Sequence, residues 1–307
     1  MSIKSELEIS NKIARDIENR IKKDLLKRYR ETNKELKLMF GNLYEKYAVK
    51  DVLTFQEMQK FNRLKTVQKD IAKAINDMYI KDKAILHQGL KKTYKSGYYR
   101  LGYAIEKDLG SKLSYRLLDV KKIEKAIQNP VSGLTLNETL IKNKTSIISK
   151  INQEITQGLV RGESYGKMAK RITETLGGDA SKAVRVAQTE AHRVHEQANL
   201  ESAEHAEDMG ISMKKIWTAT LDDATRDAHQ ELDGETIGMD EDFTSSAGGR
   251  GPGPGQMGNA ADDINCRCTL TYEVDEIAHE QRVSRDEGII KNQTYEEWAA
   301  AKEIKVS

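Results

Sequence analysis

The sequence contains few of the residues that build disulfide frameworks, rigid loops and large aromatic cores. Among 307 residues there are two cysteines, three prolines and 6% aromatic residues. Two cysteines one residue apart do not make a disulfide framework, so a reducing compartment such as a bacterial cytoplasm is expected. No run of about 18 apolar residues occurs, so no transmembrane helix is expected. The first ten residues lack the apolar segment of a signal peptide.

Several motifs of common enzyme classes are also missing. The sequence has no Walker loop, dinucleotide fingerprint, G-x-S-x-G elbow or EF-hand loop, which counts against an enzyme. What remains is a polar chain, with 32% charged residues and a mean hydropathy of −0.67. This composition is typical of a helix-rich protein with a modest core.

Charge is distributed unevenly along the chain. Residues 1–130 carry 30 Lys and Arg against 17 Asp and Glu, whereas residues 131–307 carry 20 against 31. A basic part joined to an acidic one suggests an anionic partner, with nucleic acid as the obvious choice. The alternative is that long exposed helices simply carry many lysines.

Apolar residues recur at helical spacing through the first third of the chain. Residues 3–39 carry one such stripe, which needs another helix of this chain or another subunit as its partner, and Gly41-Asn42 is expected to end or interrupt it. A second helix is predicted over 55–80, with Thr54 and Glu57 as a capping box, and residues 82–108 also read as helical. The first stripe consists of Ile9, Ile13, Ile17, Ile21, Leu25, Tyr29 and Leu36.

Tyrosines and basic residues alternate in the segment KKTYKSGYYR, residues 91–100. Such a mixture could stack on bases while its cations contact phosphates. The alternative is that Tyr94, Tyr98, Tyr99 and Tyr103 line a seam between helices with their hydroxyls in water. We favour the helix seam.

Glycine and proline residues divide the rest of the helical part. Residues 109–135 read as a hinge around a short helix at 119–128, and a helix follows over 135–160. Ser164 is expected to cap a short helix that Gly177-Gly178 stops, and a further helix runs to about Asp208. His192 and His195 on that helix lack metalloprotease spacing, so we expect them at the surface.

The stretch from Trp217 to Tyr272 differs from the helices before it. Strands are predicted at 211–220, 235–239 and 268–274, with the first and last paired. A short helix should begin at Asp222, and the Gly/Pro loop at 247–258 reads as mobile. After it, a helix over 275–283 and a capped helix from Thr294, anchored by Trp298, are expected.

This stretch also holds the candidate metal ligands. His229, Cys266 and Cys268 could bind zinc, with Asp223, Asp227 or water as the fourth ligand. Two alternatives stay open at this point. The cysteines could be buried thiols on one face of a strand, or they could form a strained C-x-C disulfide.

The same stretch carries a resemblance to a known family. Its motifs resemble the C-terminal signature of phage minor head proteins, the head-morphogenesis family related to the Mu F protein. A block at 187–191 resembles the helix that precedes the signature, although Gln188 stands where the family often has Arg. The signature motifs are Trp217, Asp223-x-x-Arg226-x-x-His229, Leu232-Asp233-Gly234, Phe243, a Gly/Pro loop and Asn265-Cys266-Arg267-Cys268.

The resemblance implies a fold and a set of structural residues. The fold class is mainly α with a small α+β C-terminal domain and an elongated helical N-terminal region. We expect a basic helical region at 1–130 for portal or DNA contact, a Mu F-like domain at 131–275 and a helical tail at 276–307. Besides the candidate zinc ligands, a structural polar cluster is expected from Glu190, Trp217, Asp223, Arg226, Asp233 and Asn265.

The resemblance also implies a function: a minor head protein of a tailed bacteriophage, without enzymatic activity. Its expected partners are the portal protein, viral DNA, and the scaffold or major capsid protein, with no membrane. It would act in head morphogenesis and in DNA packaging or ejection, in the host cytoplasm during assembly and then inside the virion head. The amphipathic stripe from Ile9 to Leu25 could serve as a docking surface.

Two rival functions remain. One is a metal-dependent hydrolase or transferase, or a toxin-like enzyme, built on Asp223, Arg226, His229 and the cysteines, which requires an open metal position or a pocket beside them. The other is a non-specific DNA-binding protein, whose affinity would fall steeply with salt.

Overall fold

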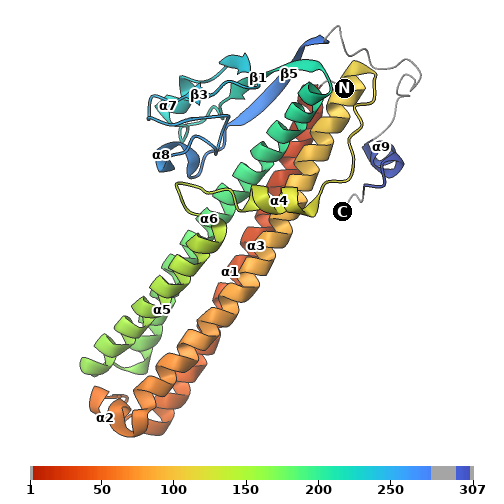
Figure 1. Ribbon diagram of the computed structural model, residues 1–307. Helices are drawn as coiled ribbons and strands as arrows, with labels where there is room; N and C mark the ends of the chain where they lie inside the picture. Colours follow the sequence, from red (N-terminus) through yellow and green to blue (C-terminus); the bar gives the residue numbers. More distant parts are fainter. Residues whose placement is uncertain (1–2, 278–294, 305–307) are drawn as a thin grey trace. The chain divides into compact units, whose positions relative to one another are not determined.

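The computed structural model of the chain describes residues 3–277 and 295–304. It is 68% helical, and its strands all lie in the C-terminal part of the sequence (Figure 1). This confirms a mainly α fold with a long helical N-terminal region and a small strand-containing C-terminal region. Its elements are α1 (Ile3–Tyr47), α2 (Phe55–Gln59), the 3-10 helix η1 (Lys60–Asn62), α3 (Arg63–Leu109), α4 (Val120–Ile127), α5 (Leu136–Val160), α6 (Tyr165–Asp208), β1 (Ile211–Thr218), α7 (Asp227–Gln230), β2 (Thr236–Gly238), β3 (Phe243–Thr244), β4 (Arg250–Gly251), α8 (Ala260–Asp263), β5 (Thr269–Ile277) and α9 (Tyr295–Ala301).

Two compact units are built from segments that lie far apart in the sequence. The first unit comprises Met1–Asn19, His87–Leu136 and Gln188–Ser307, and the second comprises Arg20–Leu86 and Asn137–Ala187. Helices α1, α3 and α6 each contribute residues to both units. A division of function at residues 130 and 275 stays a prediction. Across the described ranges, no helix has the length and apolar character that a membrane crossing requires.

In the second unit, α1 buries its apolar stripe against its own chain. Ile21 and Leu25 are 3% and 1% exposed, so this part of the stripe is not free to dock a partner. The prediction that Gly41-Asn42 ends or interrupts the helix is wrong, since α1 runs without a break to Tyr47. Phe40 is fully buried and Tyr44 is nearly so. Burial of this turn outweighs the cost of about 1 kcal/mol for a helical glycine.

Helix α6 likewise runs through Gly177-Gly178, where a break was predicted. Neither glycine has an atom within 4 Å of where its Cβ would be, so these positions tolerate a helix without requiring glycine. The residue that follows, Asp179, is buried and accepts hydrogen bonds from the hydroxyls of Tyr29 and Tyr79, at 2.7 and 2.8 Å. These tertiary contacts hold the helix together across the glycine pair.

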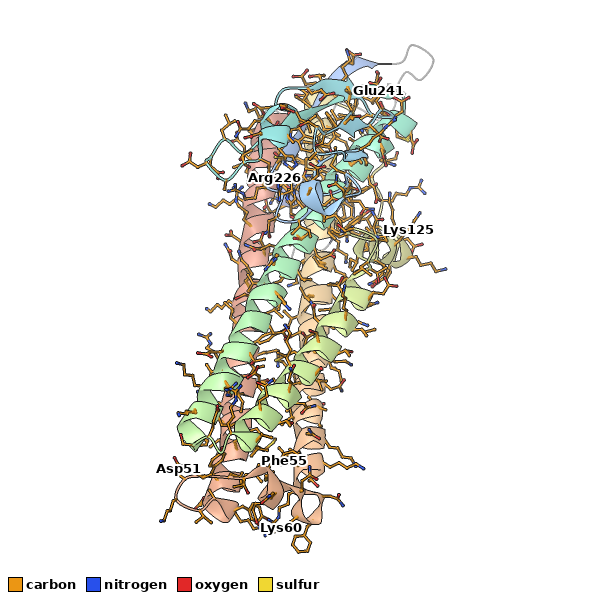
Figure 2. The ribbon with its side chains drawn as sticks, turned by 90° about the vertical axis from the view of Figure 1, so that its left-hand side faces the viewer. Asp51, Phe55, Lys60, Lys125, Arg226 and Glu241 are labelled. Atoms are coloured by element: carbon orange, nitrogen blue, oxygen red, sulfur yellow. The ribbon has the colours of Figure 1, made fainter. Side chains whose placement is uncertain are left out.

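The chain between α1 and α3 contains two short helices, α2 and η1. Thr54 caps α2 as predicted, accepting from the backbone N–H of Glu57 at 3.2 Å. The predicted helix over 55–80 is interrupted, because Phe61 and Asn62 adopt φ values of 52° and 56°, and α3 starts only at Arg63. Figure 2 shows Asp51, Phe55 and Lys60 around this connection.

Three strands of the first unit form an antiparallel sheet in the order β2-β1-β5, and β3 and β4 form a separate antiparallel pair. The predicted pairing of residues 211–220 with 268–274 is confirmed, in a register from Ile211 opposite Ile277 to Thr218 opposite Thr269. The helix predicted over 275–283 is wrong at its start, since β5 extends to Ile277. The rest of that prediction lies outside the described residues.

Aromatic residues of the first unit pack as a seam between helices. Tyr94, Tyr98, Tyr99 and Tyr103 are each at most 5% exposed, so none of the rings is free to stack on a base. Their hydroxyls are not all in water as expected, because that of Tyr94 donates to the Glu201 carboxylate. The predicted anchor on α9 is confirmed: the indole Nε1 of Trp298 donates to Glu106 at 2.6 Å.

Candidate metal centre

A turn after β1 leads the chain into α7, which carries His229. The helix predicted to begin at Asp222 begins at Asp227. The Asp222 carboxylate accepts from the backbone N–H of Ala224 at 3.0 Å and pairs with the Arg267 guanidinium. The first bond closes a turn at Asp222, and the ion pair holds this turn against the segment that contains the cysteines. His229 follows on α7 and is 2% exposed.

The two cysteines lie in the segment that enters β5. Asn265 precedes them with a φ of 57°, a left-handed conformation that asparagine tolerates better than most residues. Its backbone N–H donates to the Thr189 hydroxyl on α6 at 3.2 Å. Cys266 and Cys268 are 4% and 2% exposed, and both are free thiols. The disulfide alternative is therefore absent from this structure.

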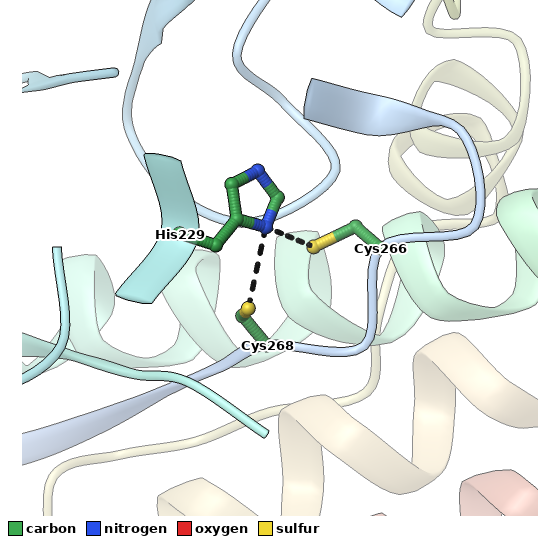
Figure 3. A group of neighbouring side chains, drawn as sticks. All are labelled: His229, Cys266 and Cys268. Atoms are coloured by element: carbon green, nitrogen blue, oxygen red, sulfur yellow. Dashed lines mark hydrogen bonds between the residues drawn. The ribbon is translucent and has the colours of Figure 1, made fainter. Parts of the chain in front are cut away.

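His229, Cys266 and Cys268 come together at one point (Figure 3). The Nδ1 atom of His229 lies 3.4 Å from the Cys268 sulfur and 3.7 Å from the Cys266 sulfur. All three donor atoms lie within 4.8 Å of one another. Thus α7 and the segment before β5, more than thirty residues apart, meet through these side chains.

Asp262 binds the other nitrogen of the imidazole, and no sequence motif had pointed to this residue. Its Oδ1 accepts from the His229 Nε2–H at 3.1 Å and from the Ser245 hydroxyl at 2.8 Å. Asp262 is fully buried on α8. With the proton on Nε2, the lone pair of Nδ1 points toward the two sulfurs. The ring of Trp217, 5.4 Å from the imidazole and edge-on to it, limits its rotation.

The electrostatics of the cluster favour a thiolate at one cysteine. A hydrogen bond from Cys266 lowers the pKa of Cys268, and the hydrogen bond with His229 lowers it further. The same interaction with Cys268 raises the pKa of His229, against the effect of burial. The pKa of Cys266 is raised by its hydrogen bond to Cys268 and by burial. The thiolate is the form of cysteine that binds a metal, whereas the raised pKa of His229 favours the imidazolium, which must lose its Nδ1 proton before that nitrogen can bind one.

The Gly/Pro loop expected to be mobile is packed around this cluster. A Cβ at Gly249 would lie 2.2 Å from the Asp262 carboxylate, and one at Gly251 would lie 1.9 Å from the carbonyl oxygen of Gln256. Only glycine fits at these two places. The neighbouring Asp263 accepts from the backbone N–H groups of Met257 and Gly258 at 2.7 and 3.0 Å.

The other residues predicted as a polar cluster are placed in different surroundings. Trp217 is fully buried against His229 and Phe243. Arg226 donates to the carbonyl oxygen of Ile264, and Figure 2 marks its position. Asp233 accepts from the backbone N–H of Ala219 at 2.8 Å.

Neither proposed carboxylate ligand is buried with the cysteines. Asp223 and Asp227 are both exposed, whereas the three candidate ligands are buried. Asn265 contributes its backbone rather than an observed side-chain bond. The carboxylate that does reach the cluster, Asp262, contacts the far side of the imidazole ring.

Glu190 belongs to a second buried network, centred on Arg193, which no sequence motif singled out. Its carboxylate pairs with Arg193 at 2.8 Å, and both side chains are at most 4% exposed. Arg193 also donates to the carbonyl oxygens of Ala126 and Ile127 at the end of α4, at 2.8 and 3.1 Å. In the sequence, only the i, i+3 spacing of Glu190 and Arg193 could have indicated this ion pair, and that spacing is equally typical of pairs on the surface.

Two histidines of α6 are less exposed than expected. His195 is 3% exposed, and its Nε2 lies 2.8 Å from the Asn11 side chain. His192 is half-buried, and its Nε2 is buried without a hydrogen-bond partner among the described residues. Burial lowers the pKa of His192 to about 4, while the charge of Cys268 acts in the opposite direction. His192 is therefore neutral near pH 7.

Comparison with known proteins places this site in a family. The sequence model of the Phage Mu protein F like family matches residues 149–271, which include all three candidate ligands. The chain is 37% identical over 273 residues to the minor head protein GP7 of Bacillus phage SPP1, covering 88% of each chain. The chain belongs to the Mu F-like family of phage minor head proteins. The predicted resemblance is thereby confirmed.

Two further relatives are similar in sequence to parts of this Mu F-like protein. A protein of Enterococcus faecalis named NAD(+)--arginine ADP-ribosyltransferase EFV is 36% identical over 210 residues, which are 68% of this chain and 43% of that protein. An uncharacterized protein of Haemophilus influenzae is 26% identical over 179 residues, or 56% of this chain and 36% of that one. No solved structure matches.

Proposed function

We propose that this protein is a minor component of a bacteriophage head that enters the procapsid by binding the portal protein. The observation that carries the proposal is the 37% identity to a minor head protein over 88% of both chains. Such coverage includes the helical N-terminal region as well as the Mu F-like segment. Its place would be the head interior, after assembly in the host cytoplasm, with roles in packaging or ejection of viral DNA.

The charge distribution supports an acidic partner for the helical region. Lys65, Lys69 and Lys73 are exposed at four-residue intervals on α3, so they lie on one face of that helix. An acidic surface on the portal protein is the partner that we propose for this face. Viral DNA, the scaffold and the major capsid protein are the alternative partners that we propose for this face.

We further propose that the chain acts without catalysis. The cluster of His229, Cys266 and Cys268 is at most 4% exposed at each side chain, so a substrate would have to displace protein to reach a donor atom. Asp223, which the enzyme hypothesis requires, is exposed and is not part of the buried cluster. The transferase activity in the name of the Enterococcus relative is that protein's, of which this chain covers 43%.

Binding to purified portal rings tests the proposal. The full chain is co-sedimented with rings at low and moderate salt, beside a Lys65→Glu, Lys69→Glu, Lys73→Glu variant. We expect wild-type binding at both salt concentrations and weaker binding by the variant, because charge reversal opposes an acidic surface. The full chain is used because removal of residues 1–130 would take segments from both compact units.

A parallel measurement with duplex DNA separates the rival function. DNA affinity that falls steeply with salt, together with no binding to rings at either salt concentration, would overturn portal association and favour the DNA-binding hypothesis. Binding to rings by wild type and variant alike would keep portal association and remove the α3 face from the contact.

A further inference from the structure

The donor atoms of the buried cluster already have the spacing of a tetrahedral metal site. Two ligands of one tetrahedral zinc ion, with about 2.0–2.1 Å to nitrogen and about 2.3 Å to sulfur, lie about 3.6 Å apart. The two distances from His229 Nδ1 to sulfur are 3.4 and 3.7 Å. Both nitrogen–sulfur distances therefore match a shared ion to within a few tenths of an ångström, and all three donor atoms lie within 4.8 Å of one another.

The imidazole is also held as a metal-ligating histidine usually is. Such a histidine commonly donates its second ring N–H to a carboxylate, which fixes the tautomer and makes the free nitrogen more basic. Asp262 does this for His229 at 3.1 Å, and Ser245 donates to the same carboxylate oxygen at 2.8 Å. This arrangement is independent of the cysteines, and it points the Nδ1 lone pair at them.

We propose that His229, Cys266 and Cys268 bind one zinc ion through Nδ1 and two thiolates, as a structural site that ties α7 to the start of β5. The donor set of two sulfurs and one imidazole suits zinc and disfavours magnesium and calcium, which prefer oxygen ligands. The site lies in the strand-containing part of the first unit. It is independent of the proposed portal contact.

The fourth position of the tetrahedron would be filled by water or, after a movement of its side chain, by His192 on α6. Among the described residues, only the donor atoms of His229, Cys266 and Cys268 lie within 4.8 Å of one another. The Nε2 atom of His192 is buried and has no hydrogen-bond partner among the described residues, and a buried polar atom without a partner is costly. The candidate carboxylates Asp223 and Asp227 are exposed and are not needed.

The first test measures metal in the full-length protein purified without chelators. We expect one zinc per chain, lost in Cys266→Ser/Cys268→Ser and in His229→Ala. His87→Ala is the matched control, since His87 pairs with Glu124 outside the cluster, and it should retain its zinc. A folded wild-type protein that neither contains zinc nor takes it up would overturn the proposal. So would zinc retained by the cysteine variant.

A second measurement uses the unaltered protein, so it does not depend on whether the variants fold. After exchange of zinc for cobalt(II), we expect strong visible absorption of a tetrahedral ion and a thiolate-to-cobalt charge-transfer band. Cobalt bound without that band would place the ion away from the cysteines and overturn the assignment.

A third variant tests the positioning role of Asp262. Asp262→Asn should lower zinc affinity by about 10- to 100-fold in competition with a chromophoric chelator, because a neutral amide oxygen accepts the Nε2–H bond more weakly than a carboxylate and makes Nδ1 less basic. Asp227→Asn, an exposed residue on α7, should leave the affinity unchanged. Equal affinities for Asp262→Asn and wild type would show that the carboxylate does not support the site.

Discussion

The second compact unit and the strand-containing part of the first are held together in different ways. In the helices of the second unit, buried apolar residues such as Leu36 and Phe40 recur once per turn. Around the cysteines, cohesion comes from carboxylates that bind backbone and side-chain donors, as Asp262 and Asp263 do. A regular stripe tolerates local exceptions such as Gly177-Gly178, whereas a polar cluster depends on each of its members.

The largest expected effect concerns the buried guanidinium of the first unit. Arg193→Ala should lower the free energy of unfolding by about 3–5 kcal/mol, because it leaves the Glu190 carboxylate buried without its charge partner. Chemical denaturation of both proteins measures the difference. Arg185→Ala, an exposed position on the same helix, should change stability by less than about 0.5 kcal/mol. Equal effects at the two arginines would show that the polar network contributes little.

A smaller loss of stability is expected when the apolar stripe of the second unit is shortened by one side chain. Leu36 is fully buried, whereas Leu38, two residues further along α1, is 60% exposed. Leu36→Ala should cost about 2–5 kcal/mol through lost burial and the cavity that it leaves. Leu38→Ala should be nearly neutral, since alanine has high helix propensity. Denaturation curves of the two variants measure both changes in the free energy of unfolding. A large loss of stability in Leu38→Ala would mean that this face of α1 is covered in solution.

The smallest effect comes from a carboxyl group that is an exception in the apolar second unit. Burial raises the pKa of Asp82 to about 7 from an ordinary value of 3.8, despite the opposing charge of Arg28. The folded chain therefore binds this proton more tightly than the unfolded chain. The resulting stability is complete below pH 4 and is lost progressively as the pH rises from about 4 through 7. Between pH 6 and pH 8 the remaining loss should be about 1.4 kcal/mol.

Asp82→Asn should remove this pH dependence, because an amide does not titrate in that range. The measurement is the difference in unfolding free energy between pH 6 and pH 8 for wild type and variant. Asp77→Asn, exposed on the same helix, should keep the wild-type slope. If Asp82→Asn also keeps the wild-type slope, a group other than Asp82 causes the loss of stability between pH 6 and pH 8.

Much of the helical part could be predicted from sequence because helical burial is periodic. The stripe through Leu25 and Leu36 needed only the spacing of apolar residues. The wrong helix end at Gly41-Asn42 and the wrong break at Gly177-Gly178 share one cause. Local propensity at a glycine is worth about 1 kcal/mol, and burial of the residues beside it outweighs that. Sequence alone does not reveal how much a given turn will bury.

The candidate site was only partly predictable for a different reason. His229, Cys266 and Cys268 stood out because cysteine is rare in this chain and because the motifs resemble a family. Asp262 did not stand out, since its contact with His229 depends on how the Gly/Pro loop folds back, 33 residues further on. Arg193 was missed because charged residues three apart on a helix are ordinarily solvent-exposed. No spacing rule separates a buried pair from a surface pair.

The order of segments in the first unit has a consequence for how the chain is made. The Asn11 side chain contacts His195, 184 residues later in the sequence. On a ribosome that adds about 5–20 residues per second, roughly 10–40 s separate the synthesis of the two residues. Glu6 can meet its partner Arg100 about 95 residues after its own synthesis, whereas Asn11 has to wait for α6. Translation speed therefore determines how long this side of the first turns stays open to chaperones and to other newly made proteins.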